Sequence, residues 1–202
     1  MRSIWVAFEG GEGSGKSTQA ARLAAALDAV LTREPGGTAV GAQVRELLLD
    51  PSVASMDARA EALLMAADRA QHIAEVVRPA LAAGRSVVSD RSAYSSLAYQ
   101  GVGRGIGVDA VWELCDWATD GLWPDVVIAM DVAEEVSSAR MKPTPDRLES
   151  AGADFHERVA EGFRILADRF ADRWLVVDGA GSVDEVEGRV GSVLDAWVAA
   201  RS

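Results

Sequence analysis

The sequence lacks several features that would point to particular classes of protein. It contains no asparagine, a single cysteine (Cys115) and only two lysines, Lys16 and Lys142, among twenty basic residues. One cysteine excludes an internal disulfide framework and a cysteine-based zinc cluster. No apolar run reaches the ~18 to 20 residues of a membrane-spanning helix, so we expect no membrane association. The first residues enter an apolar run without a small-residue cleavage site, so we expect no signal peptide and a cytoplasmic location.

The composition is that of an ordinary globular chain with an acidic surface. Its 202 residues, 49% of them hydrophobic and 25% charged, fit a single domain over 1–202 that can bury a core without metals or disulfides. The net charge of −11 argues against a nucleic-acid partner, which usually requires a basic surface. It does not exclude phosphate ligands, because positive charge can gather inside a cleft.

Five apolar runs of strand length alternate with segments of helical pattern. Strands are expected at 4–8, 30–32, 86–89, 126–132 and 174–177. Helices are expected at 16–27, 41–49, 58–81, 108–117, 134–140, 155–171 and 183–200. Continuous apolar runs are typical of strands buried on both faces of a parallel sheet. The alternation therefore predicts βαβ units and an α/β layer fold.

A glycine-rich segment, GGEGSGKST, follows the first expected strand and precedes the first expected helix. It contains the pattern G-x-x-x-x-G-K-S in the strand–loop–helix context of a P-loop. Glycines let successive backbone N–H groups turn toward a phosphate, and the helix dipole adds positive potential. We predict that Lys16 reaches the β- and γ-phosphates of a nucleoside triphosphate and that Ser17 binds Mg²⁺. The predicted phosphate-binding residues are Gly10, Gly11, Glu12, Gly13, Ser14, Gly15, Lys16, Ser17 and Thr18.

A P-loop alone is compatible with a small kinase, a GTPase-type switch or a motor ATPase. The switch needs an asparagine-containing base-reading element, and this chain has no asparagine. Motor ATPases usually carry an acidic pair at the end of a central strand, and the strand ends VSDR and AMDV have none. Asp90 and Arg91 instead place a carboxylate for Mg²⁺ beside a guanidinium at a strand end, where ligands bind in open α/β sheets. A guanidinium there suits an anionic phosphoryl acceptor, which favours a small kinase.

Six blocks, in this order, resemble thymidylate kinases of the bacterial type over nearly the whole chain. They are FEGGEGSGKST (8–18), TREPGGT (32–38), ADRAQH (67–72), SDRSAYSSLAYQGVGRG (89–105), PDVVIAMDV (124–132) and DRLES (146–150). The resemblance implies a P-loop kinase fold, with a five-stranded parallel sheet flanked by helices and a small lid. It also implies a cytoplasmic homodimer that uses Mg²⁺ and transfers the γ-phosphate of ATP in line to dTMP, giving dTDP.

The resemblance also assigns residues to the acceptor. Arg33 and Pro35 belong to a loop over the monophosphate, Arg69 hydrogen-bonds thymine, and Tyr99 lies beneath the sugar and excludes a 2′-hydroxyl. Met65 stands where the family commonly has an aromatic residue that stacks on the base. The dTMP-binding residues are expected to be Glu12, Arg33, Pro35, Met65, Arg69, Arg91, Ser95, Ser96, Tyr99 and Gln100. The metal-binding residues are expected to be Ser17, Asp90 and Glu12.

A candidate lid covers 141–152, where two prolines interrupt the helical pattern. Some members of the family carry an arginine at the P-loop position of Gly13, and glycine cannot supply that charge. We therefore expect basic lid residues to do so, the candidates being Arg140, Lys142 and Arg147. The predicted catalytic residues are Lys16, Arg91, Arg140 and Arg147.

Two alternatives remain at this point. One is another small kinase acting on dUMP or a deoxynucleoside, and the other is a P-loop sensor without turnover. Neither His72 nor His156 has a neighbouring metal-ligand or triad pattern, and both are expected at the surface or in helix packing. Cys115 lies on an apolar helical segment and is expected in the core.

Overall fold

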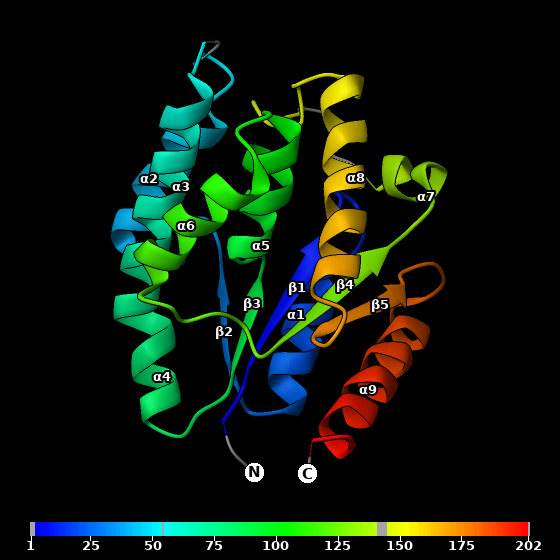
Figure 1. Cartoon of the computed structure of the whole chain (residues 1–202). Helices are drawn as coiled ribbons and strands as arrows, with labels where there is room; N and C mark the ends of the chain where they lie inside the picture. Colours follow the sequence, from blue (N-terminus) through cyan, green and yellow to red (C-terminus); the bar gives the residue numbers. More distant parts are fainter. Residues whose placement is uncertain (1–2, 54, 141–144, 202) are drawn as a thin grey trace.

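A computed structural model of the chain describes residues 3–53, 55–140 and 145–201. Its centre is a five-stranded, wholly parallel sheet with strand order β2-β3-β1-β4-β5. The strands are β1 Trp5–Gly10, β2 Val30–Arg33, β3 Val87–Asp90, β4 Val126–Asp131 and β5 Trp174–Asp178. The five expected strands and the α/β class are confirmed (Figure 1).

Helices cover both faces of this sheet (Figure 1). They are α1 Lys16–Ala26, α2 Ala39–Leu49, α3 Ala58–His72, α4 Arg78–Ala82, α5 Ala93–Ser96, α6 Val108–Thr119, α7 Glu134–Ala139, α8 Ala153–Arg169 and α9 Val183–Ala199. Two π-helical segments, η1 Ile73–Val77 and η2 Leu97–Gly103, extend α3 and α5. Among the described residues, none of these helices combines the length and apolarity that crossing a bilayer requires.

Side chains alternate between the two faces of the sheet and build separate parts of the core. Phe8 and Ile128 point to the face covered by α1 and α9. Val127 points to the opposite face, where it packs against α5, η2, α6 and α8. Trp5, on that same side, packs with η1. Because both faces are covered, the strands are apolar almost throughout, which explains why their runs could be recognised in the sequence.

The expected helix at 58–81 is a helical unit in three parts, α3, η1 and α4. At the junction the Arg78 N–H bonds to the carbonyl of Ile73, the wider spacing of a π-turn. Pro79 follows directly, and its ring has no N–H to continue an α-helical ladder. The helical segment α5–η2 was not among the helices expected from the apolar pattern, and it contains Gly101 and Gly103, which are unfavourable inside a helix. Gly103 is required by packing, since an added Cβ would lie 2.8 Å from the Phe155 ring of α8.

The parallel register brings the carboxyl ends of the strands to one edge of the sheet. Phe8 and Arg33 both pair with Asp90, and Gly10 pairs with Met130. The P-loop, the loop after β2 and the Asp90–Arg91 step therefore emerge side by side. The functional residues that the sequence predicted in separate blocks are gathered at this edge.

Candidate active site

The P-loop is a tight turn whose shape depends on glycine. Gly10, Gly13 and Gly15 have φ angles of +131°, +69° and +91°, in the region that side chains rarely adopt. A Cβ on Gly10 would lie 2.4 Å from the Met130 carbonyl oxygen of the neighbouring strand. Helix α1 then begins at Lys16 with no side chain capping its N-terminus. The loop therefore leaves the positive end of α1 available to an anion.

Lys16 lies buried inside this turn. Its ammonium donates to the Gly11 carbonyl oxygen and, at 3.2 Å, to Ser14 Oγ. Burial, with a smaller effect from the nearby charge of Arg91, lowers the pKa of Lys16 to about 8. A polyphosphate bound in the loop would supply negative charge beside the Lys16 ammonium, whose positive charge is disfavoured by burial. The side chain is thus well placed to exchange its loop contacts for phosphate oxygens.

A hydroxyl and a carboxylate meet beside the P-loop. Ser17 Oγ, on the first turn of α1, donates to Asp90 Oδ2 at the end of β3 with a separation of 2.5 Å. Both are hard oxygen donors of the kind that Mg²⁺ prefers when phosphates complete its coordination. No cluster of three or more His, Cys, Asp or Glu side chains suited to a metal occurs among the described residues. The donor set therefore fits an ion held partly by nucleotide phosphates.

Arg91 is the charged centre of the site. Its backbone has φ +71°, which turns the side chain from the end of β3 back over the P-loop. The guanidinium is paired with the Glu12 carboxylate and also donates to Ser95 Oγ at 3.1 Å and Tyr99 Oη at 3.2 Å. Burial opposes its charge, but Tyr99 and Glu12 raise its pKa, so Arg91 stays charged. Glu12, expected near the metal, is ion-paired with Arg91 here.

Glu9 supports this arrangement from below and was missed by the sequence analysis. The carboxylate is fully buried and accepts hydrogen bonds from the backbone N–H and hydroxyl of both Ser92 and Ser95. Burial raises the pKa of Glu9 above its ordinary value. These bonds hold the start of α5 against the end of β1. They fix the backbone that follows Arg91.

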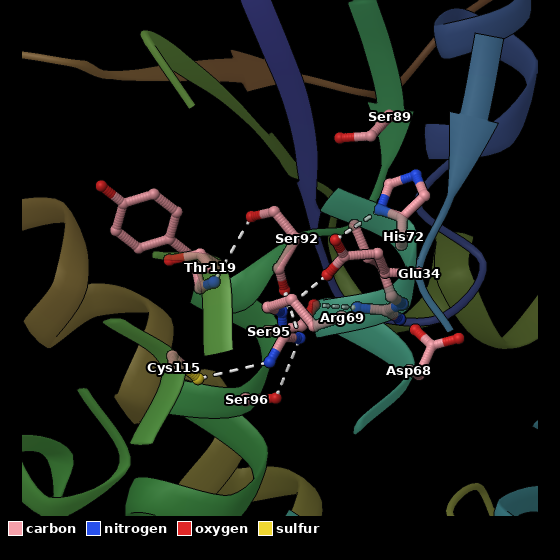
Figure 2. A network of polar contacts seen from close by, with 12 residues as sticks. Glu34, Asp68, Arg69, His72, Ser89, Ser92, Ser95, Ser96, Cys115 and Thr119 are labelled. Carbon is pink, nitrogen blue, oxygen red and sulfur yellow. Dashed lines mark hydrogen bonds and ion pairs between the residues drawn. The ribbon is translucent and has the colours of Figure 1, made fainter. Parts of the chain in front are cut away.

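A second buried network positions Arg69 (Figure 2). The two oxygens of Glu34 bind Arg69 Nε and His72 Nδ1, each at 2.8 Å. Arg69 also donates to Ser96 Oγ at 3.2 Å and to Cys115 Sγ at 3.3 Å. Glu34, Arg69 and His72 are each at most 3% exposed. Cys115 is buried, as predicted.

The network also refines the prediction for His72, which lies in the interior and is not a surface residue. Its second ring nitrogen contacts Thr32 Oγ1 at 2.7 Å, so it links α3 to β2. The i, i+3 spacing of Arg69 and His72 places them on one face of α3. This spacing, together with Glu34 in the EPGG block, was the sequence signal that could have predicted the buried network.

The loop after β2 carries additional positive charge. Arg45 Nη1, on α2, donates to the Pro35 carbonyl oxygen at 2.9 Å, and the Gly36 N–H donates to Asp68 at 2.8 Å. Burial and the nearby charge of Arg33 lower the pKa of Arg45. Arg45 was not predicted, since an arginine on an exposed helix usually lies in solvent. With Arg33 and Arg91 it makes this end of the site electropositive.

One cavity of about 780 Å³ contains both the P-loop side and the Arg69 side of the site. The predicted residues that line it are Glu12, Gly13, Gly15, Lys16, Ser17, Thr18, Arg33, Pro35, Met65, Arg69, Asp90, Arg91, Ser95, Ser96, Tyr99, Gln100 and Arg140. Gly10, Gly11 and Ser14 belong to the same loop but do not line this cavity. His156, half-buried, also contributes to the wall and contacts the Glu149 carbonyl oxygen at 3.0 Å.

The two lid arginines lie in different places. Arg140 Nη1 donates to the Gly179 carbonyl oxygen at 3.2 Å and lies 3.9 Å from a Cβ built on Gly15, next to the P-loop. Arg147 instead donates to Glu61 at 2.9 Å and to the Leu48 carbonyl oxygen at 2.7 Å. The prediction that both flank the phosphates therefore needs correction, because the structure holds Arg147 against a buried carboxylate. Lys142 lies outside the described residues, as do positions 141–144 of the candidate lid.

Gly13 is in close contact with α7. A Cβ on Gly13 would lie 2.4 Å from the Ser137 carbonyl oxygen. A side chain at this position would displace the helix that ends next to Arg140. The structure therefore agrees with the expectation that the P-loop itself supplies no arginine here.

Comparisons with known proteins converge on one family. The family model described as Thymidylate kinase matches residues 8–190. A thymidylate kinase of Bifidobacterium longum (strain DJO10A) is 45% identical over 194 residues, covering 92% of this chain and 94% of the relative. One of Lactobacillus helveticus is 40% identical over 208 residues, covering 96% and 97%. The crystal structure of thymidylate kinase from Ehrlichia chaffeensis superposes with a TM-score of 0.80 at 31% identity, covering 96% of this chain and all of that one.

Proposed function

Because this chain belongs to the thymidylate kinase family, we propose that it transfers the γ-phosphoryl group of ATP to dTMP, giving dTDP and ADP. The observation that carries the proposal is that one cavity joins a P-loop to an arginine-rich acceptor side. An oxygen of the dTMP phosphate attacks the γ-phosphorus while the bond to the β-phosphate oxygen breaks. Catalysis then consists of alignment and charge neutralisation, because no covalent enzyme intermediate is required.

On the donor side, the backbone of the P-loop and Lys16 hold the ATP phosphates. Lys16 releases Gly11 and Ser14 and binds β- and γ-phosphate oxygens. Ser17 and Asp90 would hold Mg²⁺, with Glu12 nearby, and the bound ion would supply positive charge to the phosphates. The support for this site is the contact between the Ser17 hydroxyl and the Asp90 carboxylate.

On the acceptor side, Arg33 and Arg91 bind the dTMP phosphate, with Arg45 beside them. The Arg33 guanidinium has no hydrogen bond or ion pair within the described part of the chain, so it can bind a phosphate without first breaking a contact. Arg69, Ser96 and Gln100 face the base, with Met65 on the cavity wall. Pro35 lies near the base, and Ser95 and Tyr99 complete the sugar and phosphate end. The Tyr99 ring packs edge-on against Phe155 and Phe163, which makes it a rigid wall.

Arg140 is the lid residue that supports transition-state charge. Its place beside Gly15, together with the close contact between Gly13 and α7, supports this assignment. Arg147 does not act on the phosphates. Its partners are Glu61 and the carbonyl of Leu48.

A panel of acceptors tests the proposed activity. ADP release would be measured with dTMP, dUMP, dCMP, dGMP and thymidine. Acceptor-dependent turnover with kcat/KM highest for dTMP is expected. Preference for dUMP or thymidine would instead assign a different small kinase, and no turnover with any acceptor would leave only a nucleotide sensor.

We further propose that the protein is a cytoplasmic homodimer. The support lies on the adjoining helices α3 and α6, where Trp117 is 81% exposed and Leu63 is 59% exposed. Covering such apolar side chains is a common reason for association. Light scattering should show a dimer, and Trp117→Glu should shift it to monomer. Leu27→Glu, directly after α1 at the opposite face of the sheet, is the matched control and should remain dimeric.

A further inference from the structure

Glu61 is a fully buried carboxylate that the sequence analysis did not single out. It lies on α3 and accepts four hydrogen bonds. Oε1 receives Gln100 Nε2 at 2.8 Å and Arg104 Nε at 3.1 Å. Oε2 receives Arg104 Nη2 and Arg147 Nη1, both at 2.9 Å. Three segments remote in sequence therefore meet at one side chain.

The charge state of Glu61 dictates how the Gln100 amide is turned. Burial favours the neutral acid, but the bonds from Arg104 and Gln100 hold the pKa of Glu61 below its ordinary value. An ionised carboxylate can only accept hydrogen bonds, so the NH₂ group of Gln100 must face it. The carbonyl oxygen of the same amide must then face the other way.

That oxygen is the unexplained atom of the site. Gln100 is fully buried and lines the cavity, yet its Oε1 has no hydrogen-bond partner among the described residues. A buried amide oxygen without a partner loses the free energy of its hydration. A ligand that donates an N–H in the cavity would restore that hydrogen bond.

We propose that Glu61 is a positioning residue for acceptor selectivity: by fixing the Gln100 amide, it presents Oε1 as an acceptor for the ring N–H of the acceptor base. The proposal rests on the proposed function and deepens it. Thymine and uracil carry a proton on the ring nitrogen between their two carbonyls. Cytosine has a bare acceptor there, which would meet the Gln100 oxygen without a hydrogen. Glu61 would thus contribute to discrimination without touching the nucleotide.

Arg104 and Arg147 have a supporting part in this arrangement. Two guanidiniums keep a buried carboxylate ionised, and so keep the amide from rotating. Arg104 also lies over the Phe155 ring, 4.3 Å from its centroid. Arg147 fastens the described part of the candidate lid to α2, through the bond between its own N–H and the Leu49 carbonyl oxygen at 3.1 Å. The conformation of that segment is therefore linked to the base-reading amide.

A double-mutant cycle between Glu61 and Gln100 tests the proposal. Glu61→Gln frees the amide to turn, so KM for dTMP should rise about tenfold while kcat changes by less than about threefold. The ratio of kcat/KM for dTMP over dCMP should fall about tenfold. Gln100→Ala should reduce the same ratio, and the double variant should reduce it no further. An unchanged ratio in Glu61→Gln, or additive losses in the double variant, would overturn the proposal.

Arg158→Met is the matched control. Arg158 Nε donates to the Gly103 carbonyl oxygen at 3.0 Å, so it anchors the same π-helical segment without touching Glu61 or Gln100. This variant should lower the melting temperature and leave the dTMP-to-dCMP ratio unchanged. A fall in the ratio here would mean that any loosening of η2 alters selectivity.

The wild-type protein carries a second test that does not depend on a folded variant or on turnover. The NMR signals of the Gln100 side-chain amide can be identified by their loss in Gln100→Ala. In the free protein one of its two protons should exchange slowly, as a bond to a buried carboxylate requires. Fast exchange of both protons would overturn the proposal. If wild type fails to phosphorylate dTMP while this proton is protected, the proposed function fails and the role of Glu61 in holding Gln100 stands.

Discussion

The donor and acceptor sides of the cavity are built in different ways. The donor side is a continuous stretch, residues 10–18, whose conformation comes from glycines with positive φ and from the start of α1. The acceptor side takes its residues from the loop after β2, from α3 and from the continuous segment α5–η2. A continuous turn needs few outside contacts, whereas a surface assembled from three segments needs bonds between them.

The two sides of the cavity also differ in whether their positive charges are paired with carboxylates. Lys16 forms no ion pair within the described residues and is held by oxygens of its own loop. Arg69 and Arg91 are instead paired with Glu34 and Glu12. Removing one partner of a buried pair costs about 3–5 kcal/mol, because the other charge stays behind. Donor-side substitutions should therefore reduce turnover, and acceptor-side substitutions should reduce both stability and selectivity.

The largest effect is expected from Lys16→Ala. Loss of the P-loop ammonium should lower kcat/KM by about 10³-fold or more. The melting temperature should stay the same or rise, because a buried cation without a paired charge is removed. Steady-state kinetics and thermal unfolding check both parts. Turnover within a few-fold of wild type would mean that Lys16 does not carry transition-state charge.

The next largest difference is expected between Arg140, directly before the candidate lid, and Arg147, within it. Arg140→Ala should lower kcat by about 10²- to 10³-fold with little change in KM for dTMP, as expected for charge that acts in the transition state. Arg147→Ala should leave kcat within about tenfold and lower the melting temperature, because Glu61 loses a donor. Equal losses of kcat in both would show that Arg147 reaches the phosphates during turnover.

Glu34→Gln tests the acceptor side. Breaking its pair with Arg69 should cost about 3–5 kcal/mol in the free energy of unfolding, measured by urea denaturation. Glu161→Gln, in an exposed pair with Arg164, is the control and should cost less than about 1 kcal/mol. Although burial opposes the charge of Glu34, Arg69 holds its pKa below the ordinary value. Wild type should therefore lose this contribution as pH falls through the lowered pKa, and the variant should be less sensitive to acid.

The smallest effect concerns the sugar. Tyr99→Ala should reduce the ratio of kcat/KM for dTMP over its ribose counterpart by about tenfold, because the ring no longer blocks a 2′-hydroxyl. Tyr99→Phe keeps the ring and loses only the contact with Arg91, so it should keep the ratio. A ratio that is the same in all three proteins would show that Tyr99 serves only in packing.

The five apolar strands and the P-loop could be predicted from the sequence because each depends on local rules. A strand covered on both faces is apolar along its length, and a phosphate-binding turn needs glycine at set positions. Most of the acceptor residues were found through resemblance. Gln100 and Arg69, for example, lie on the cavity, but nothing in their own segments separates them from ordinary helix residues.

The tertiary structure alone decided which charges are buried and how they are paired. Glu9, Glu34 and Glu61 look in sequence like any other acidic residue, and each proves to be an interior carboxylate that holds functional side chains. Arg147, which was predicted beside the phosphates, binds Glu61, 86 positions away in the sequence. Local sequence sets backbone conformation and hydrophobic period. The pairing of buried charges depends on which distant segments the fold brings together, because a buried ion is stable only beside a partner.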